Sequence, residues 1–161
     1  MKHQMIVGVM GGGKASAPDI QAAYELGALI AIQGWILLNG GRNAGIMDAS
    51  ARGARDQGGI TVGILPDNSI RRVSEHIQIP IVTGMGDARN NINVLTSNIV
   101  VACPGGAGTI SEIALALKNR KQVILFNFDT GAVFEDYRRK GLLFEAETPE
   151  AVIELIKRLT A

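Results

Sequence analysis

The sequence has 161 residues, enough for one domain with a hydrophobic core that needs no disulfide. An apolar fraction of 47% argues against disorder, and a net charge of +1 gives no support for general nucleic-acid binding. Cys103 is the one cysteine, which excludes an intrachain disulfide. Without a signal-peptide pattern, or an apolar stretch of the roughly 18 residues that span a membrane, we expect a cytoplasmic protein with one ligand-binding domain over residues 1–161.

Seven short apolar runs predict a parallel sheet, because continuous apolar residues suit strands that are covered on both faces. The predicted strands are Met5–Met10, Trp35–Asn39, Ile60–Leu65, Ile79–Thr83, Asn98–Cys103, Gln122–Asn127 and Leu142–Ala146. Ser16 and Asp19 form the pattern of a capping box for a helix over Asp19–Gln33, and Thr148 precedes Pro149 at a last helix. The alternation predicts a Rossmann-like, doubly wound α/β sheet flanked by helices on both faces.

Three glycine-rich segments follow predicted strands, at the edge where open α/β sheets bind ligands. They contain Gly11, Gly12, Gly13 and Lys14 in the first, Gly40, Gly41 and Arg42 in the second, and Gly105, Gly106, Ala107, Gly108 and Thr109 in the third. We expect their backbone N–H groups, at the starts of helices, to bind a phosphate. The first loop is also compatible with a tight turn that binds nothing, and Arg42 with a solvated loop residue. The third loop is the most specific of the three signals.

The first loop departs from the dinucleotide fingerprint, since its third conserved position holds Ser16. The second predicted strand ends in Asn39, where an acidic residue would bind the ribose of NAD. We therefore expect no NAD. No ligand spacing for a metal is present, and we expect no metal site.

Two charged residues could act beside these loops. Glu112 lies in the first turn after Gly108 and is predicted to point away from an apolar stripe. That stripe consists of Ile110, Ile113, Ala114 and Leu117. Arg89 follows Asp87, a predicted helix cap, so its charge opposes the helix dipole and calls for an anion, either Glu112 or a phosphate. Both residues are also compatible with solvated positions.

Asn90, Asn91 and Asn93 follow Arg89 and offer neutral hydrogen bonds rather than charge. If the protein is an enzyme, Arg89 and Glu112 are the candidate catalytic residues.

The segment from Pro104 to Glu112 reads PGGAGTISE and matches the pattern P-G-G-x-G-T-x-x-E in full. The chain therefore resembles the Lonely Guy (LOG) cytokinin-activating phosphoribohydrolases and their relatives, the molybdenum-cofactor carrier proteins. The segment from Gly40 to Met47 resembles the G-G-x-x-G-L-M segment of the same superfamily. The resemblance extends over nearly the whole chain, and it implies a Rossmann-like fold and a homo-oligomer, either a dimer or a tetramer.

In LOG enzymes the motif glutamate acts with an arginine of an R-K pair to cleave the N-glycosidic bond of nucleoside 5′-monophosphates. Glu112 and Arg89 match these two residues, but Asn90 stands at the lysine position. This departure and the short chain favour a resemblance to the carrier subgroup, which binds a phosphorylated pterin without turnover. A relation to DNA-processing proteins is more distant.

The favoured hypothesis is thus a carrier of the molybdenum cofactor (molybdopterin), with a phosphoribohydrolase as the alternative. A carrier implies a molybdoenzyme or a cofactor-synthesis protein as partner. Nothing in the sequence supports pyridoxal phosphate (PLP) or a decarboxylase.

Overall fold

The computed structural model describes residues 3–161; Met1 and Lys2, which open the predicted 1–161 domain, lie outside the described residues. In chain order its elements are β1 (Ile6–Met10), α1 (Ala17–Ile32), β2 (Ile36–Asn39), α2 (Gly45–Asp56), β3 (Thr61–Leu65), β4 (Ile79–Val82), η1 (Gly86–Ala88), α3 (Arg89–Thr96), β5 (Ile99–Ala102), α4 (Ala107–Lys118), β6 (Val123–Phe126), α5 (Glu135–Arg139), β7 (Leu143–Ala146) and α6 (Pro149–Thr160). All seven predicted strands are confirmed, each within one residue of its expected ends.

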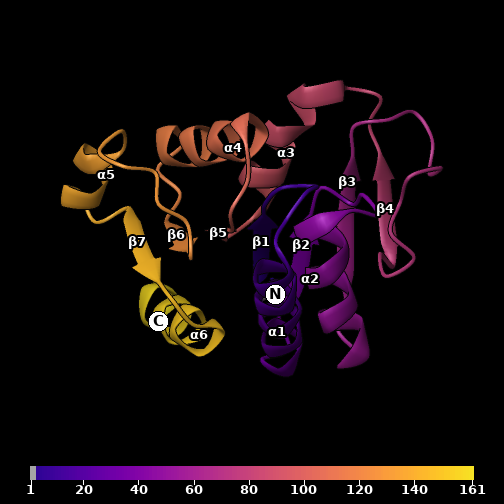
Figure 1. Cartoon of the computed structure of the whole chain (residues 1–161), viewed down its shortest axis with the longest axis horizontal. Coiled ribbons are helices and arrows are strands. Elements are labelled where there is room, and N and C mark those ends of the chain that lie inside the picture. The colour runs from indigo at the N-terminus through magenta and orange to yellow at the C-terminus, as the bar shows by residue number, and fades with distance from the viewer. Residues whose placement is uncertain (1–2) are drawn as a thin grey trace.

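The strands form one parallel sheet in the order β4-β3-β2-β1-β5-β6-β7. Helices α1, α2 and α6 cover one face, and α3 and α4 cover the other (Figure 1). The predicted doubly wound α/β fold is therefore confirmed. The chain builds outward from β1 to β4 and then returns to place β5 beside β1. This reversal opens a crevice at the carboxyl ends of β1 and β5, the place where such sheets bind ligands.

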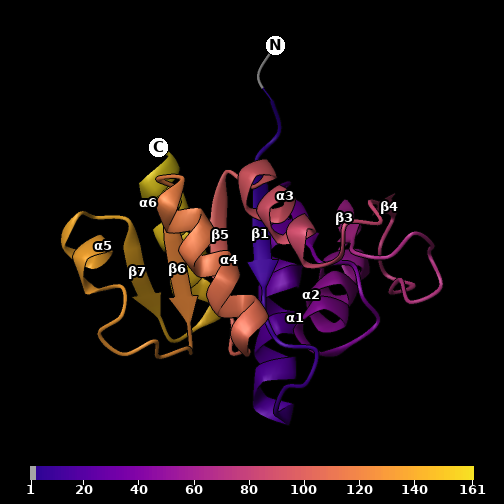
Figure 2. The same cartoon turned by 90° about the horizontal axis from the view of Figure 1, so that it is seen from above.

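Alternate residues of the central strands face two separate cores. Val7 and Val9 of β1 pack with Leu26 and Ile30 of α1 on one face. Met10, at the end of the same strand, packs in the core that α3 and α4 cover. Parallel pairing of β1 with β2 and β5 then fixes where the three glycine loops begin. Figure 2 shows the arrowheads of β1, β6 and β7 pointing the same way.

Side-chain caps determine where the first and last helices begin. Ser16 Oγ accepts from Asp19 N at 3.2 Å, so α1 begins at Ala17, two residues before the predicted start. Thr148 Oγ1 accepts from Ala151 N at 3.2 Å, as its sequence pattern predicts. None of the helices between residues 3 and 161 combines the length and the apolar character that a membrane crossing requires.

Strand β4 is an exception among the apolar runs, because all four of its residues are exposed. The crossover from β3 to β4 is a loop over residues 66–78 rather than a helix. Without a covering helix, Ile79, Ile81 and Val82 keep 46%, 43% and 45% of their surfaces exposed. The expectation that this run is covered on both faces is therefore wrong.

Candidate functional site

The three glycine loops meet around a cavity of about 230 Å³ at the carboxyl ends of the central strands. The predicted site residues that line it are Gly11, Gly12, Gly13, Gly40, Arg89, Gly106, Gly108, Thr109 and Glu112. Its remaining lining consists of Val9, Met10, Met47, Asp87 and Asn90. The predicted residues outside the lining are Lys14, Gly41, Arg42, Gly105 and Ala107.

Gly12 holds the three loops together through its backbone. Its N–H donates to Pro104 O of the third loop at 3.0 Å, and its carbonyl accepts from Ile46 N of α2 at 3.0 Å. This N–H is therefore already used within the protein. The first loop thus contacts both of the others, and a shift of any one loop would disturb these hydrogen bonds.

Close contacts between the loops explain why glycine is needed at several positions. Gly45 has a φ of +50°, and a Cβ there would lie 2.2 Å from Gly12 O. A Cβ at Gly105 would lie 2.1 Å from Thr109 Oγ1. These two glycines permit the packing of the loops. By contrast, a Cβ at Gly106 or Gly108 would meet no protein atom within 4 Å.

The start of α4 offers unpaired backbone donors to the cavity. Its N-cap residue is Gly106, so no side chain caps the helix. Helix α2 likewise has no side-chain cap, since its N-cap residue is Ala44, whereas α1 and α6 have their own caps. First-turn N–H groups lack intrahelical partners and attract anions. The hydroxyl-bearing Thr109, only 4% exposed, lies in the same first turn.

Arg89 begins α3, as predicted, and its guanidinium lies along the wall of the cavity. Nη1 donates to the carbonyls of Gly40, at 2.6 Å, and Ile64. Glycine is needed at position 40, because a Cβ there would lie 2.5 Å from that nitrogen. Burial lowers the pKa of Arg89, and the Glu112 carboxylate opposes this shift. Arg89 Nε is buried and has no hydrogen-bond partner among residues 3–161.

Asp87 does not cap α3, contrary to the expectation. It lies in the short helix η1, and Ala88, which has no side chain able to cap, precedes α3. The extra turn of η1 places Asp87 in the lining of the cavity instead. Two anions, Asp87 and Glu112, thus share the cavity with Arg89, and both favour the charged form of the arginine.

Glu112 is buried, with 7% of its surface exposed, and lines the cavity, so of the two alternatives the solvated position is wrong. The helix turns Thr109, Glu112, Ile113 and Ala116 inward and leaves Ala114 exposed. Glu112 Oε1 accepts a hydrogen bond of 2.9 Å from Asn93 Nδ2. Burial raises the pKa of Glu112 to about 7, against the opposing effects of Asn93 and Arg89.

Two other predicted cations lie away from the cavity. Lys14 is exposed at the rim. Arg42 pairs with Asp67 at 3.5 Å and forms an isolated bridge with Val73. These contacts hold Arg42 against the crossover loop over residues 66–78, and it does not line the cavity.

Three asparagines organise the site, and their roles were not predicted from the sequence. Buried Asn39 Oδ1 accepts from Gly41 N at 2.7 Å and so fixes the second loop. Asn39 stands where an NAD-binding protein would have an acidic residue for the ribose. Asn90, 8% exposed, donates to Ser111 Oγ at 3.2 Å. Asn93 holds Glu112, as described above. The asparagines after Arg89 in the sequence indicated neutral hydrogen bonds, but they did not indicate the partners of these bonds.

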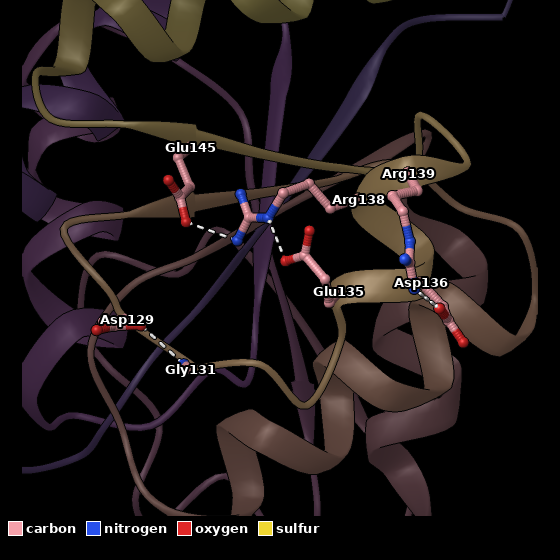
Figure 3. A network of polar contacts seen from close by, with 7 residues as sticks. All are labelled: Asp129, Gly131, Glu135, Asp136, Arg138, Arg139 and Glu145. Carbon is pink, nitrogen blue, oxygen red and sulfur yellow. Dashed lines mark hydrogen bonds and ion pairs between the residues drawn. The ribbon is translucent and has the colours of Figure 1, made fainter.

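A second hollow, of about 640 Å³, lies at the ends of β6 and β7. Its lining includes Asn127, Asp129, Glu145 and Glu147. Arg138 of α5 pairs with Glu145 at 2.7 Å and with Glu135 at 3.2 Å (Figure 3). Gly131 N donates to Asp129 Oδ1 at 2.7 Å in the same loop. These polar groups bind one another at the surface.

Across residues 3–161, no group of three or more His, Cys, Asp and Glu side chains is placed to hold a metal ion. Cys103 is buried, as expected, and burial raises the pKa of its thiol to about 12.

The chain resembles several known proteins over its whole length. A molybdenum cofactor binding protein from the phototrophic bacterium Rippkaea orientalis is 48% identical, with a TM-score of 0.94 and 100% of each chain covered. The molybdenum cofactor carrier protein of Chlamydomonas reinhardtii is 43% identical, with a TM-score of 0.88 and coverage of 98% and 99%.

A more distant relative is a cytokinin riboside 5′-monophosphate phosphoribohydrolase of Mycobacterium tuberculosis. It is 38% identical over 96 residues, which span 58% of this chain and 51% of that enzyme. The family model that matches is the SLOG cluster4 family, over residues 4–153. This match covers nearly all of the chain, so the protein belongs to the SLOG cluster4 family.

Proposed function

We propose that this protein binds and carries the molybdenum cofactor, a pterin with a phosphate, in the cavity between its glycine loops. The observation that carries the proposal is the uncapped start of α4, whose first-turn donors face a cavity that also contains Arg89 and Glu112. The identity of 48% to a molybdenum cofactor binding protein supports the same ligand.

In this proposal the phosphate binds the backbone N–H groups of Gly108 and Thr109, with the hydroxyl of Thr109 as a further donor. Arg89, which lines the same cavity, supplies positive charge. Glu112 contacts polar groups of the pterin. The cavity of about 230 Å³ is smaller than the roughly 300–1,000 Å³ of typical small-molecule sites, so part of the ring system would extend beyond its mouth.

A phosphoribohydrolase is the second candidate. It is favoured by buried Glu112 in a cavity that Arg89 also lines, because a carboxyl with a pKa of about 7 suits acid–base work at neutral pH. Asn90 argues against it, since this residue is buried against Ser111 where the LOG enzymes have a lysine.

A blocking variant tests the proposed site without harming the fold. Gly108 lines the cavity, and a Cβ there would meet no protein atom, so Gly108→Leu should fill the ligand space and leave the helix intact. Ala107 is exposed and does not line the cavity, which makes Ala107→Leu the matched control. We expect saturable protection of the cofactor from oxidation in the native protein and the control, but not in Gly108→Leu.

The same protein samples should be incubated with AMP and isopentenyl-AMP, and free base and ribose 5-phosphate measured by chromatography. A carrier releases neither product. Release of base that disappears in Glu112→Gln would overturn the carrier proposal in favour of the hydrolase.

We also propose a homo-oligomer, a dimer or a tetramer. The exposed apolar side chains of Ile79, Ile81 and Val82 support it, since a patch of this kind marks contact surfaces. Light scattering on the native protein and on Ile81→Lys should show a larger assembly only for the former. A carrier further implies a protein partner that loads or receives the cofactor, either a cofactor-synthesis protein or a molybdoenzyme.

A further inference from the structure

A buried hydrogen bond joins α3 to α4 beside the cavity. Asn93 Nδ2 donates to Glu112 Oε1 at 2.9 Å, and Asn93 is fully buried. Glu112 lines the cavity, whereas Asn93 does not. The amide therefore contacts the carboxyl from the protein side, and any ligand meets only Glu112.

The other end of this amide is unsatisfied. Asn93 Oδ1 is buried and has no hydrogen-bond partner among residues 3–161. A buried carbonyl oxygen without a partner lowers stability, and an apolar side chain of similar size would remove this unpaired atom, although it would also remove the donor to Glu112. Packing alone thus gives no reason for an asparagine at this position.

A change in the charge of the Glu112 carboxyl does give a reason for an asparagine at position 93. An amide has a donor and an acceptor on the same carbon, and a half-turn of the side chain exchanges them. Nδ2 donates to a carboxylate, and after the exchange Oδ1 can accept the proton of a neutral carboxylic acid. A lysine or arginine at this place could serve only the charged form.

The other charged groups at the cavity fit this interpretation. Arg89, on α3, favours the carboxylate form of Glu112, and Asp87, on η1, lines the same cavity. Arg89 and Asn93 lower the pKa of Glu112, but burial has the larger effect and raises it to about 7. Both forms of the carboxyl are therefore populated near neutral pH.

We propose that Asn93 is a positioning residue whose side-chain amide holds the Glu112 carboxyl at the cavity in both its charged and its neutral form. This inference rests on the proposed function, in which Glu112 contacts the polar groups of the ligand.

The first experiment needs no ligand. Urea unfolding across a pH series, with and without Glu112→Gln, isolates the pH transition that belongs to Glu112. We expect Asn93→Leu to move the midpoint of this transition upward by about one pH unit, because the carboxylate loses a donor. Asn93→Asp should move it further, because a second carboxylate repels the first.

Thr61→Val is the matched control. Thr61 is a buried polar residue of β3 that donates to His76 O at 2.6 Å and lies outside the cavity lining. It should lose stability and leave the midpoint of the Glu112 transition unchanged. An unchanged midpoint in Asn93→Leu would overturn the proposal, whatever its stability.

The second experiment measures cofactor binding against pH. We expect Asn93→Leu to bind at least about fivefold more weakly than the native protein at neutral pH, while still unfolding cooperatively in urea. Equal affinity would count against the inference. If the native protein neither binds the cofactor nor cleaves AMP, the proposed function fails, while the pH transitions of the first experiment still test Asn93.

Discussion

Two hollows lie at the same carboxyl edge of the sheet, and only one has the features of a binding site. The cavity at β1, β2 and β5 is bounded by glycine loops and two helix starts that lack side-chain caps. The hollow at β6 and β7 is larger, but Glu145 in its lining pairs with Arg138, and helix α6, which follows β7, has Thr148 as a side-chain cap.

The two hollows differ in whether their polar groups find hydrogen-bond or ion-pair partners within the protein. In the second hollow the charges pair across a few residues of one segment, as Figure 3 shows. In the first, backbone donors and a buried arginine nitrogen have no partner within residues 3–161. A location at the carboxyl ends of the strands is thus not sufficient for a binding site. The unpaired groups lie between β1 and β5, where the strand order reverses.

The largest effect is expected from a methyl group between the loops. Gly45 and Gly131 both have positive φ, but a Cβ at Gly45 would clash with Gly12 O at 2.2 Å and one at Gly131 would meet nothing. Gly45→Ala should lower the unfolding free energy by about 4 kcal/mol, through backbone strain and overpacking. Gly131→Ala, the control, should lose only about 1 kcal/mol in urea unfolding. Similar losses would mean that the loops are not tightly packed.

The next effect concerns the pH dependence of stability. The pKa of Glu112 is raised from 4.5 to about 7, so the folded state binds more protons than the unfolded state between these values. Its contribution is therefore complete below about pH 4.5 and is lost as the pH rises through about 7, by roughly 3 kcal/mol. Glu112→Gln should be as stable as the native protein at low pH and more stable at about pH 8.

A curve for Glu112→Gln that runs parallel to that of the native protein would show that Glu112 has an ordinary pKa. Glu145→Gln, in the exposed hollow, gives the comparison, since this carboxyl lies at the surface.

A smaller effect is expected from the arginine of the cavity. Arg89→Lys keeps the charge but loses the geometry that joins the carbonyls of Gly40 and Ile64. We expect cofactor affinity to fall by about tenfold, or about 1.4 kcal/mol, in a binding titration. Retained affinity would indicate that Arg89 contributes only its charge.

The smallest effect is expected from Arg138 in the second hollow. Its ion pairs with Glu135 and Glu145 are solvent-exposed, and such pairs contribute up to about 1 kcal/mol. Arg138→Ala should change the unfolding free energy by no more than this and leave cofactor binding unchanged. A loss of binding would assign the second hollow a role in ligand recognition.

The strands and the order of the loops could be predicted because each depends on local sequence. Apolar runs mark the strands, and Ser16 and Thr148 mark two helix starts through contacts only three residues long. The apolar stripe of α4 is confirmed for Ile113 and Leu117 but is wrong for Ala114, which is exposed. Thr109 and Glu112 of the same helix line the cavity.

Contacts between distant segments could not be predicted. Asn93 and Glu112 are 19 residues apart, and Arg89 meets the carbonyl of Gly40 from 49 residues away. Their pairing depends on how α3 packs against α4 and on the order of the strands. The sequence indicated the chemistry of these groups but not their partners.

The composition of β4 limits how copies of this chain can join. Pro80, in the middle of this edge strand, has no N–H. Thr83 N, three residues later, donates to Leu65 O of β3, and because N–H groups alternate sides along a strand, the nitrogen of Pro80 faces away from β3. The missing donor therefore interrupts the outer edge, where a further strand would have to pair. Growth of the sheet from chain to chain at β4, a route to fibrous aggregates, is disfavoured.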